Sequence, residues 1–240
     1  MTVTALVSGG KDSIFSAYLA DTQGWTVDEL LVVRPEDPDS WMFHTPNLPL
    51  VELQAEAWGK RCRSEPVTGR REEDEIEALR VALAAGSGPV VAGAIASSYQ
   101  WSRLLRVADE VHRPVYTPLW GKEGSTVVRA EIDAGLDIRM IHLSAEPLTE
   151  ELLGQRLDLR LLVELERRSH ELRRFHSAGE GGEFETLVVD APFFERRIAL
   201  DETHIEQQGG ARRLTVDRAH LEPKRPSEIP DAPERRAGAR

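Results

Sequence analysis

Cysteine is almost absent from this sequence. Cys62 is the single cysteine in a chain of 240 residues. Internal disulfides, zinc sites built on Cys-x-x-Cys pairs and dithiol redox chemistry all need a second thiol. These three classes of protein are therefore excluded.

Long apolar segments are also missing. The longest nearly apolar run, Pro89–Ala96, is far shorter than the roughly 20 residues of a membrane-spanning helix. The amino terminus has no basic stretch ahead of an apolar one, which is the pattern of a secretory leader. We therefore expect no membrane segment and a cytoplasmic protein.

Positive charge is in short supply as well. Lys and Arg number 30 against 41 Asp and Glu, which gives a formal net charge of −11. A surface of this sign repels phosphate backbones unless a local basic patch intervenes. We therefore expect no stable nucleic-acid binding, whereas a site for one nucleotide needs only local donors.

Strand-like and helix-like segments alternate through the first half of the chain. The apolar runs at residues 3–7, 28–33 and 90–95 predict buried strands, and helical patterns follow them. This order is typical of a parallel sheet that helices cover on both faces, an α/β fold.

The pattern divides the chain into three parts. We expect the α/β domain in residues 1–115 and a smaller C-terminal α+β domain in residues 116–222, where helix and strand signals are mixed. Residues 223–240 mix Pro, Arg, Glu and Ala without periodicity. Such a composition predicts a disordered tail.

A glycine-rich hexapeptide, Ser8-Gly9-Gly10-Lys11-Asp12-Ser13, joins the first expected strand to the first helix. Backbone N–H groups at such a turn and the dipole of the following helix attract anions. The hexapeptide matches neither the Walker loop, GxxxxGK[ST], nor the dinucleotide fingerprint, GxGxxG. The plain structural alternative is a glycine turn that merely leads into a helix.

The hexapeptide resembles the SGGxDS loop of the N-type ATP pyrophosphatases, or PP-loop enzymes, which split ATP between its α and β phosphates. The resemblance implies a five-stranded parallel sheet of the HUP type, which is Rossmann-like, with ATP as cofactor. All six residues would bind the nucleotide, and Ser8, Lys11 and Asp12 would be catalytic. Mg²⁺ is expected at Asp12 to neutralise the departing pyrophosphate. Lys11 either contacts phosphate or points into solvent.

Four further segments follow in order: His44–Asn47, Gly93–Arg103, Pro118–Trp120 and Gly179–Thr186. The first three have plain alternatives as a turn, a crossover with a helix cap and an interdomain hinge. In the fourth, acidic residues between glycines suggest a pocket shaped to bind a cation. Together with the hexapeptide, the four segments resemble the diphthine-ammonia ligase family over roughly residues 3–194. The chain departs from that family's pattern at residues 103–108.

The resemblance implies further site residues. The nucleotide site would be completed by Val33, His44, Asn47 and Gly93. The acceptor would lie at Ser97, Tyr99, Gln100, Arg103, Gly181, Gly182, Glu183 and Phe184.

Glu183 and Glu185 are the predicted catalytic carboxylates. Side chains two apart in an extended segment project to the same face. At least one would hold the ammonium and remove its proton. The alternatives are that they bind the quaternary ammonium of diphthine or cap backbone N–H groups.

The implied reaction is the ATP-dependent amidation of diphthine on translation elongation factor 2 to give diphthamide. Diphthine's carboxylate would form an acyl adenylate and release pyrophosphate, and ammonia from free ammonium would displace AMP. A PP-loop ligase that modifies tRNA remains an alternative, disfavoured by the acidic charge and the missing cysteine pair. The other alternative is a non-catalytic nucleotide-sensing protein of the universal-stress type, a class that usually has a different glycine loop.

Overall fold

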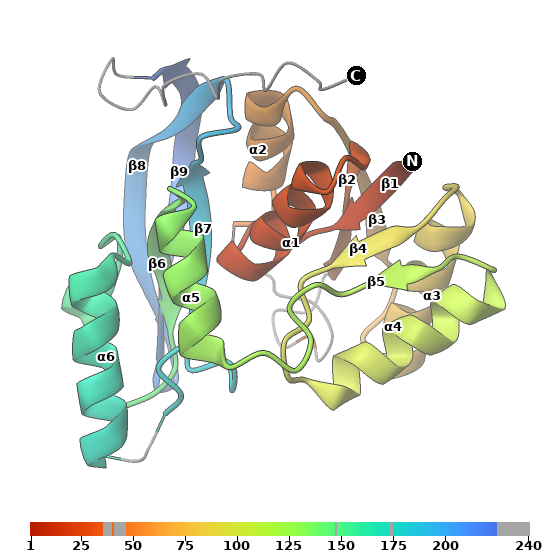
Figure 1. The fold of residues 1–240 in the computed structure, drawn as a ribbon. Coiled ribbons are helices and arrows are strands. Elements are labelled where there is room, and N and C mark those ends of the chain that lie inside the picture. Colours follow the sequence, from red (N-terminus) through yellow and green to blue (C-terminus); the bar gives the residue numbers. More distant parts are fainter. Residues whose placement is uncertain (36–39, 41–46, 147, 173–174, 225–240) are drawn as a thin grey trace.

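The structure, a computed structural model, describes residues 1–35, 40, 47–146, 148–172 and 175–224. Its strands form two sheets (Figure 1). The first sheet is built from β1 (Thr2–Leu6), β2 (Thr26–Pro35), β3 (Arg61–Val67), β4 (Val90–Ala92) and β5 (Val115–Tyr116). The second is built from β6 (Asp137–Leu143), β7 (Phe184–Asp190), β8 (Arg196–Gln208) and β9 (Ala211–Pro223). The helices are α1 (Lys11–Thr22), α2 (Leu50–Trp58), α3 (Glu72–Ala84), α4 (Ser98–Glu110), α5 (Gly124–Asp133), the short 3-10 helix η1 (Glu150–Leu152) and α6 (Leu159–Leu172).

The first sheet is parallel, in the order β3-β2-β1-β4-β5. Alternate side chains of its strands enter two separate cores. Ala5 and Val32 pack on the side of α1 and α2, whereas Leu31 and Val33 pack on the side of α3 and α4 (Figure 1). The predicted α/β class and five-stranded parallel sheet are confirmed.

The second sheet is antiparallel, in the order β7-β6-β9-β8. Apolar side chains of α5 and α6 share a core with one face of this sheet. Leu50 of α2 packs on the other face, against Leu187 and Ile198. The second sheet therefore lies beside the first, with α1 and α2 between them.

The sequence patterns missed some elements. β3 reads Arg-Cys-Arg-Ser-Glu-Pro-Val, which lacks apolar alternation, and β5 has two residues. α5 opens with Gly124-Ser125-Thr126, and the Glu123 carboxylate caps it by accepting from the N–H groups of Ser125 and Thr126. β4 ends at Ala92, short of the predicted Ile95. Of the predicted tail, residues 225–240 lie outside the described residues.

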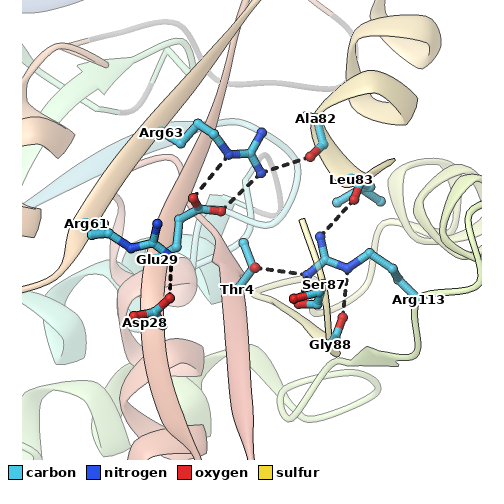
Figure 2. Close-up of polar contacts among 10 residues, drawn as sticks. All are labelled: Thr4, Asp28, Glu29, Arg61, Arg63, Ala82, Leu83, Ser87, Gly88 and Arg113. Carbon is cyan, nitrogen blue, oxygen red and sulfur yellow. Dashed lines mark hydrogen bonds and ion pairs between the residues drawn. The ribbon is translucent and has the colours of Figure 1, made fainter. Parts of the chain in front are cut away.

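A buried arginine ties α4 and β5 to the centre of the first sheet (Figure 2). Arg113 is 5% exposed, and burial lowers its pKa. Its guanidinium donates to four acceptors at 2.7–3.0 Å, namely Thr4 Oγ1 and the carbonyls of Leu83, Ser87 and Gly88. Such a group is tolerated inside because its donors are satisfied.

A second arginine bridges the β2 and β3 edge to α3 (Figure 2). Arg63 donates to both carboxylate oxygens of Glu29, at 3.1 and 3.0 Å, and to the carbonyl of Ala82 at 2.9 Å. The pair is bidentate, a geometry that holds both partners in one orientation.

We predict that Arg113→Met lowers the free energy of unfolding by about 2–4 kcal/mol, because the four acceptors lose their donor inside the protein. Urea unfolding at neutral pH measures this change. The matched control is Arg106→Met on α4, where the side chain is 58% exposed. Equal midpoints for the two variants would contradict the structural role of Arg113.

Candidate functional site

The glycine loop, residues 8–13, is clamped by α2 and β7. The carbonyl of Gly9 accepts from Gln54 Nε2 at 2.8 Å and from the N–H of Val188 at 3.0 Å. Gln54 Nε2 also donates to the carbonyl of Val188 at 2.7 Å, and the N–H of Lys11 donates to Thr186 Oγ1 at 3.2 Å. The peptide bond between Gly9 and Gly10 is trans, so the N–H of Gly10 points in the opposite direction to the carbonyl of Gly9 and away from these partners. The loop therefore depends on the second sheet as well as on β1.

Two glycines are required by the geometry of this site. Gly9 has φ +83°, and a Cβ there would lie 3.0 Å from Gln54 Oε1. A Cβ on Gly93, just after β4, would lie 2.6 Å from the backbone nitrogen of Ser13. Gly93 therefore lets β4 approach the start of α1.

The two serines of the loop hold its shape. The N–H of Ser8 donates to Ser13 Oγ at 3.2 Å, and Ser13 Oγ donates to the carbonyl of Gly10 at 3.1 Å. This leaves the hydroxyl of Ser8 with a long contact of 3.5 Å to Ser13 Oγ.

A cavity of about 540 Å³ lies at the carboxyl ends of β1, β2 and β4. From the predicted nucleotide site it is lined by Ser8, Gly10, Lys11, Asp12, Ser13, Val33 and Gly93. From the predicted acceptor and catalytic residues it is lined by Ser97, Gln100, Gly181, Gly182, Phe184 and Glu185. The structure therefore brings the glycine loop and the acidic loop Gly179–Glu185 to one cavity.

Lys11 and Asp12 form an ion pair at the cavity wall. Lys11 Nζ lies 2.7 and 2.8 Å from the two oxygens of Asp12, and Lys11 is 3% exposed. Burial would lower the pKa of Lys11, but Asp12 and Glu131 outweigh it and raise the pKa. Of the two predicted positions for Lys11, solvent is therefore wrong.

Two more carboxyls stand beside this ion pair. Glu131 of α5 is fully buried, and burial, then the charge of Asp12, raises its pKa well above the usual value. Glu180 is partly buried and lines the cavity; burial, then Asp12, raises its pKa to about 7 while Lys11 opposes the shift. A carboxyl that titrates near neutral pH is suited to general acid-base work.

Glu183 takes the capping role that was one of its alternatives. Its carboxylate accepts from the N–H of His176 at 2.7 Å and from the N–H of Gly181 at 2.8 Å. It is not among the residues that line the cavity, whereas Glu185 is, with its Oε1 3.7 Å from His142 Nδ1. Within the acidic loop, Glu180 and Glu185 face the cavity and Glu183 holds the loop.

Three other predicted residues lie elsewhere. Asn47 uses its side-chain amide on β9, donating to the carbonyl of Leu214 and accepting from the N–H of Val216. Arg103 lies over the ring of Tyr99 and pairs with Glu72 of α3. Asn47, Tyr99 and Arg103 are therefore occupied outside the cavity, because their hydrogen-bond partners come from neighbouring elements. The predicted nucleotide residue His44 lies outside the described residues.

Among the described residues, four ionisable side chains at or near the cavity were missed: Glu131, His142, Glu180 and Arg213. Glu180 stands in the acidic loop, where its place between two glycines was a usable signal. Glu131 and His142 lie on α5 and β6, elements that the patterns did not show. Arg213 was read only as part of a polar strand pair, and nothing local marks it as facing a cavity.

The described residues contain no cluster of three or more His, Cys, Asp or Glu side chains able to hold a metal ion. Both oxygens of Asp12 are engaged by Lys11. The described residues therefore do not form a magnesium site by themselves. Magnesium at Asp12 stays a prediction.

Fold and site together define the class. A parallel sheet in this order, with a glycine loop at the start of α1 and a cavity over the carboxyl ends of its strands, is typical of PP-loop nucleotide-binding proteins. The chain belongs to the diphthamide synthase family: the model of the family's N-terminal domain matches residues 1–113, and that of its C-terminal domain matches residues 124–221. Membership of this family implies the use of ATP.

The curated relatives include diphthine–ammonia ligases of several eukaryotes. That of Danio rerio is 31% identical over 228 residues, which cover 85% of this chain and 88% of the relative. That of Mus musculus is 29% identical over 257 residues, with 93% and 94% covered. That of Schizosaccharomyces pombe is 31% identical over 234 residues, and this match spans 88% of the chain but only 38% of the longer relative.

Among solved structures, a predicted subunit of tRNA methyltransferase from Methanocaldococcus jannaschii matches 80% of this chain and 97% of its own, at 17% identity and a TM-score of 0.44. In the part of the chain that the structure describes, no helix is long and apolar enough to cross a membrane.

We predict that Gln54→Leu lowers the free energy of unfolding by about 1–3 kcal/mol, because the buried carbonyls of Gly9 and Val188 each lose a donor. Chemical unfolding measures the change. Gln207→Leu on the exposed part of β8 is the matched control. If Gln54→Leu unfolds no earlier than this control, the amide does not hold the glycine loop.

Proposed function

We propose that this chain amidates diphthine on translation elongation factor 2, with ATP and ammonium as co-substrates. The observation that carries the proposal is that the glycine loop and the acidic loop line the same cavity. The first is suited to phosphates and the second to a cationic nitrogen, and amidation through an adenylate needs both within one site. The match to diphthamide synthase domain models over both halves of the chain supports the same activity.

In this proposal the nucleotide lies over the carboxyl ends of β1, β2 and β4. The base lies near Val33 and Gly93, and the phosphates lie at the glycine loop. Lys11 and the positive end of the α1 dipole stabilise the charge that develops on pyrophosphate. Magnesium would arrive bound to the phosphates of ATP, and no step is assigned to it.

The reaction has two halves. An oxygen of the diphthine carboxylate bonds to the α phosphorus while the bond from that phosphorus to the β-phosphate oxygen breaks, which releases pyrophosphate. The nitrogen of ammonia then bonds to the acyl carbon while the bond from that carbon to the AMP oxygen breaks. Ammonium gives up one proton before this attack, and the nitrogen loses a second proton as the amide forms.

Glu180 is the residue that we assign to the first proton. Its carboxyl faces the cavity, and its pKa of about 7 leaves a large ionised fraction at neutral pH. The ionised form holds ammonium by charge and then accepts its proton. The sequence pattern assigned this role to at least one of Glu183 and Glu185. The carboxylate of Glu183 instead accepts hydrogen bonds from the N–H groups of His176 and Gly181.

If the proposed activity is correct, the protein should catalyse ATP–pyrophosphate exchange in the presence of elongation factor 2 that carries diphthine. Ammonium should not be needed, because it enters only after the adenylate has formed. Radiolabelled pyrophosphate measures the exchange, and unmodified factor is the control. Exchange that instead requires tRNA would favour a tRNA-modifying ligase. ATP binding without exchange on any of these substrates would favour a nucleotide sensor.

We predict that Glu180→Gln lowers amidation at pH 7 by about 100-fold or more, the scale of a lost acid-base group. Wild-type activity should fall as the pH drops below about 7, because protonated Glu180 accepts no proton. In the variant the amidation rate should depend only on the concentration of free ammonia, which rises with pH. The difference in rate between wild type and variant should therefore become smaller at alkaline pH.

Glu183→Gln is the matched control from the same loop. It should weaken the loop and lower stability but keep the wild-type dependence on pH. A Glu180→Gln enzyme with the wild-type rate and pH profile would remove Glu180 from the mechanism.

A further inference from the structure

Three side chains of the second sheet form a row that no step of the proposed reaction uses. Glu185 lies on β7, His142 on the neighbouring strand β6, and Arg213 on β9, the next strand across the sheet. In the strand pairing, His142 is opposite Glu185 on one side and opposite Arg213 on the other. Residues directly opposite each other in neighbouring strands project to the same face of a sheet. All three line the cavity, so the row is part of the wall that the second sheet contributes.

An irregularity in β6 places the histidine in this row. Met140 is opposite Thr186, but the pairing then skips Ile141, so that His142 comes to lie opposite Glu185. A bulge of this kind redirects a side chain and is over-represented beside active sites. His142 Nδ1 lies 3.7 Å from Glu185 Oε1 and has no hydrogen-bond partner among the described residues. The backbone of β6 therefore brings the imidazole between the carboxylate and the guanidinium.

The guanidinium of Arg213 is the positive end of the row. Among the described residues that line the cavity, Lys11 and Arg213 are the only Lys or Arg. Lys11 Nζ is held by both oxygens of Asp12, at 2.7 and 2.8 Å. On the other side of Arg213, the facing residue of β8 is Glu206, which is hydrogen-bonded to His204 at 3.0 Å. Arg213 is therefore the cation that the second sheet offers to an anion in the cavity.

The acidic end of the row lies beside the glycine loop. Thr186, the residue after Glu185, accepts from the N–H of Lys11 at 3.2 Å, and a Cβ on Gly10 would lie 3.2 Å from the carbonyl oxygen of Thr186. Neighbouring strands are about 4.8 Å apart, so the backbone of Arg213 is roughly 10 Å further across the sheet than that of Glu185. Arg213 consequently stands across the cavity from the loop that is suited to phosphates.

We propose that this row receives the end of the acceptor side chain, which carries both a carboxylate and a quaternary ammonium. Arg213 binds the carboxylate, because its planar fork of donors matches the two carboxylate oxygens. Glu185 faces the quaternary ammonium, and His142 keeps the charges of Glu185 and Arg213 from neutralising each other. The carboxylate is then held between the nucleotide and Arg213, which offsets its repulsion from the phosphates. The choice of acceptor rests on the proposed function, whereas the binding of a zwitterion by the row does not.

A small probe tests the row without the elongation factor. Glycine betaine carries a carboxylate and a quaternary ammonium on one carbon, and tetramethylammonium carries the cation alone. In NMR titrations, Arg213→Met should weaken the binding of betaine by about tenfold or more, the scale of a lost hydrogen bond between charged groups. Tetramethylammonium should bind this variant at least as tightly as the wild type, because a positive charge has been removed. Glu185→Gln should weaken the binding of both probes.

The modified factor tests the same residue in the reaction. In ATP–pyrophosphate exchange, Arg213→Met should raise KM for the factor by about tenfold to 100-fold and leave KM for ATP unchanged. Arg213→Lys keeps the charge but not the fork, and its KM for the factor should lie between those of the wild type and Arg213→Met. The matched control is Arg212→Met, at the preceding position of β9, where the side chain pairs with Glu150 at 3.6 Å and does not line the cavity. This control should leave both constants unchanged.

Three results would overturn the proposal. The first is a wild type that binds no betaine, and the second is an Arg213→Met variant that binds betaine as the wild type does. The third is a raised KM for ATP with an unchanged KM for the factor, because Arg213 would then bind phosphate. If the wild type exchanges no pyrophosphate with the modified factor but its betaine binding depends on Arg213 and Glu185, the proposed function fails and the zwitterion site stands.

Discussion

The carbonyl of Gly9 is the group on which the site depends. It lies in the interior between two sheets, where an unpaired backbone carbonyl would be costly. Its two donors come from Gln54 on α2 and Val188 on β7, and neither belongs to the loop or to β1. The glycine loop is consequently held by the second sheet. The carbonyl of Gly9 needs the N–H of Val188 as a donor, so β7 has to lie beside the loop, and the cavity forms between them.

The charges around the glycine loop are balanced partly by protons. A chain with net charge −11 has to accommodate phosphates. Near the glycine loop it places one lysine among three carboxyls, and burial with like charge raises the pKa of Glu131 and Glu180. Protons therefore compensate part of the negative charge at the site. This arrangement leaves one carboxyl poised near neutral pH beside the cavity.

The two ends of the first sheet serve different purposes. Near the amino ends of the strands, Arg63 pairs with Glu29, and every guanidinium nitrogen of the buried Arg113 donates to an acceptor (Figure 2). At the carboxyl ends, polar groups line an open cavity. Stability and reactivity are thus kept apart, because saturated hydrogen bonds stabilise a fold while a reactive site needs groups that can exchange partners.

Local patterns in the sequence were enough for the glycine loop, the acidic loop and three strands of the parallel sheet, because turns, helix periodicity and apolar runs lie in neighbouring residues. The five-stranded sheet followed from the resemblance to PP-loop enzymes, since β3 and β5 carry no clear strand pattern. They did not decide which glutamate does what. Glu180 and Glu183 stand three apart in one motif, yet one faces the cavity and the other binds N–H groups of its own loop. Only the tertiary structure shows that Glu131 is buried near the ion pair of Lys11 and Asp12, since burial and the approach of distant segments depend on how both sheets pack.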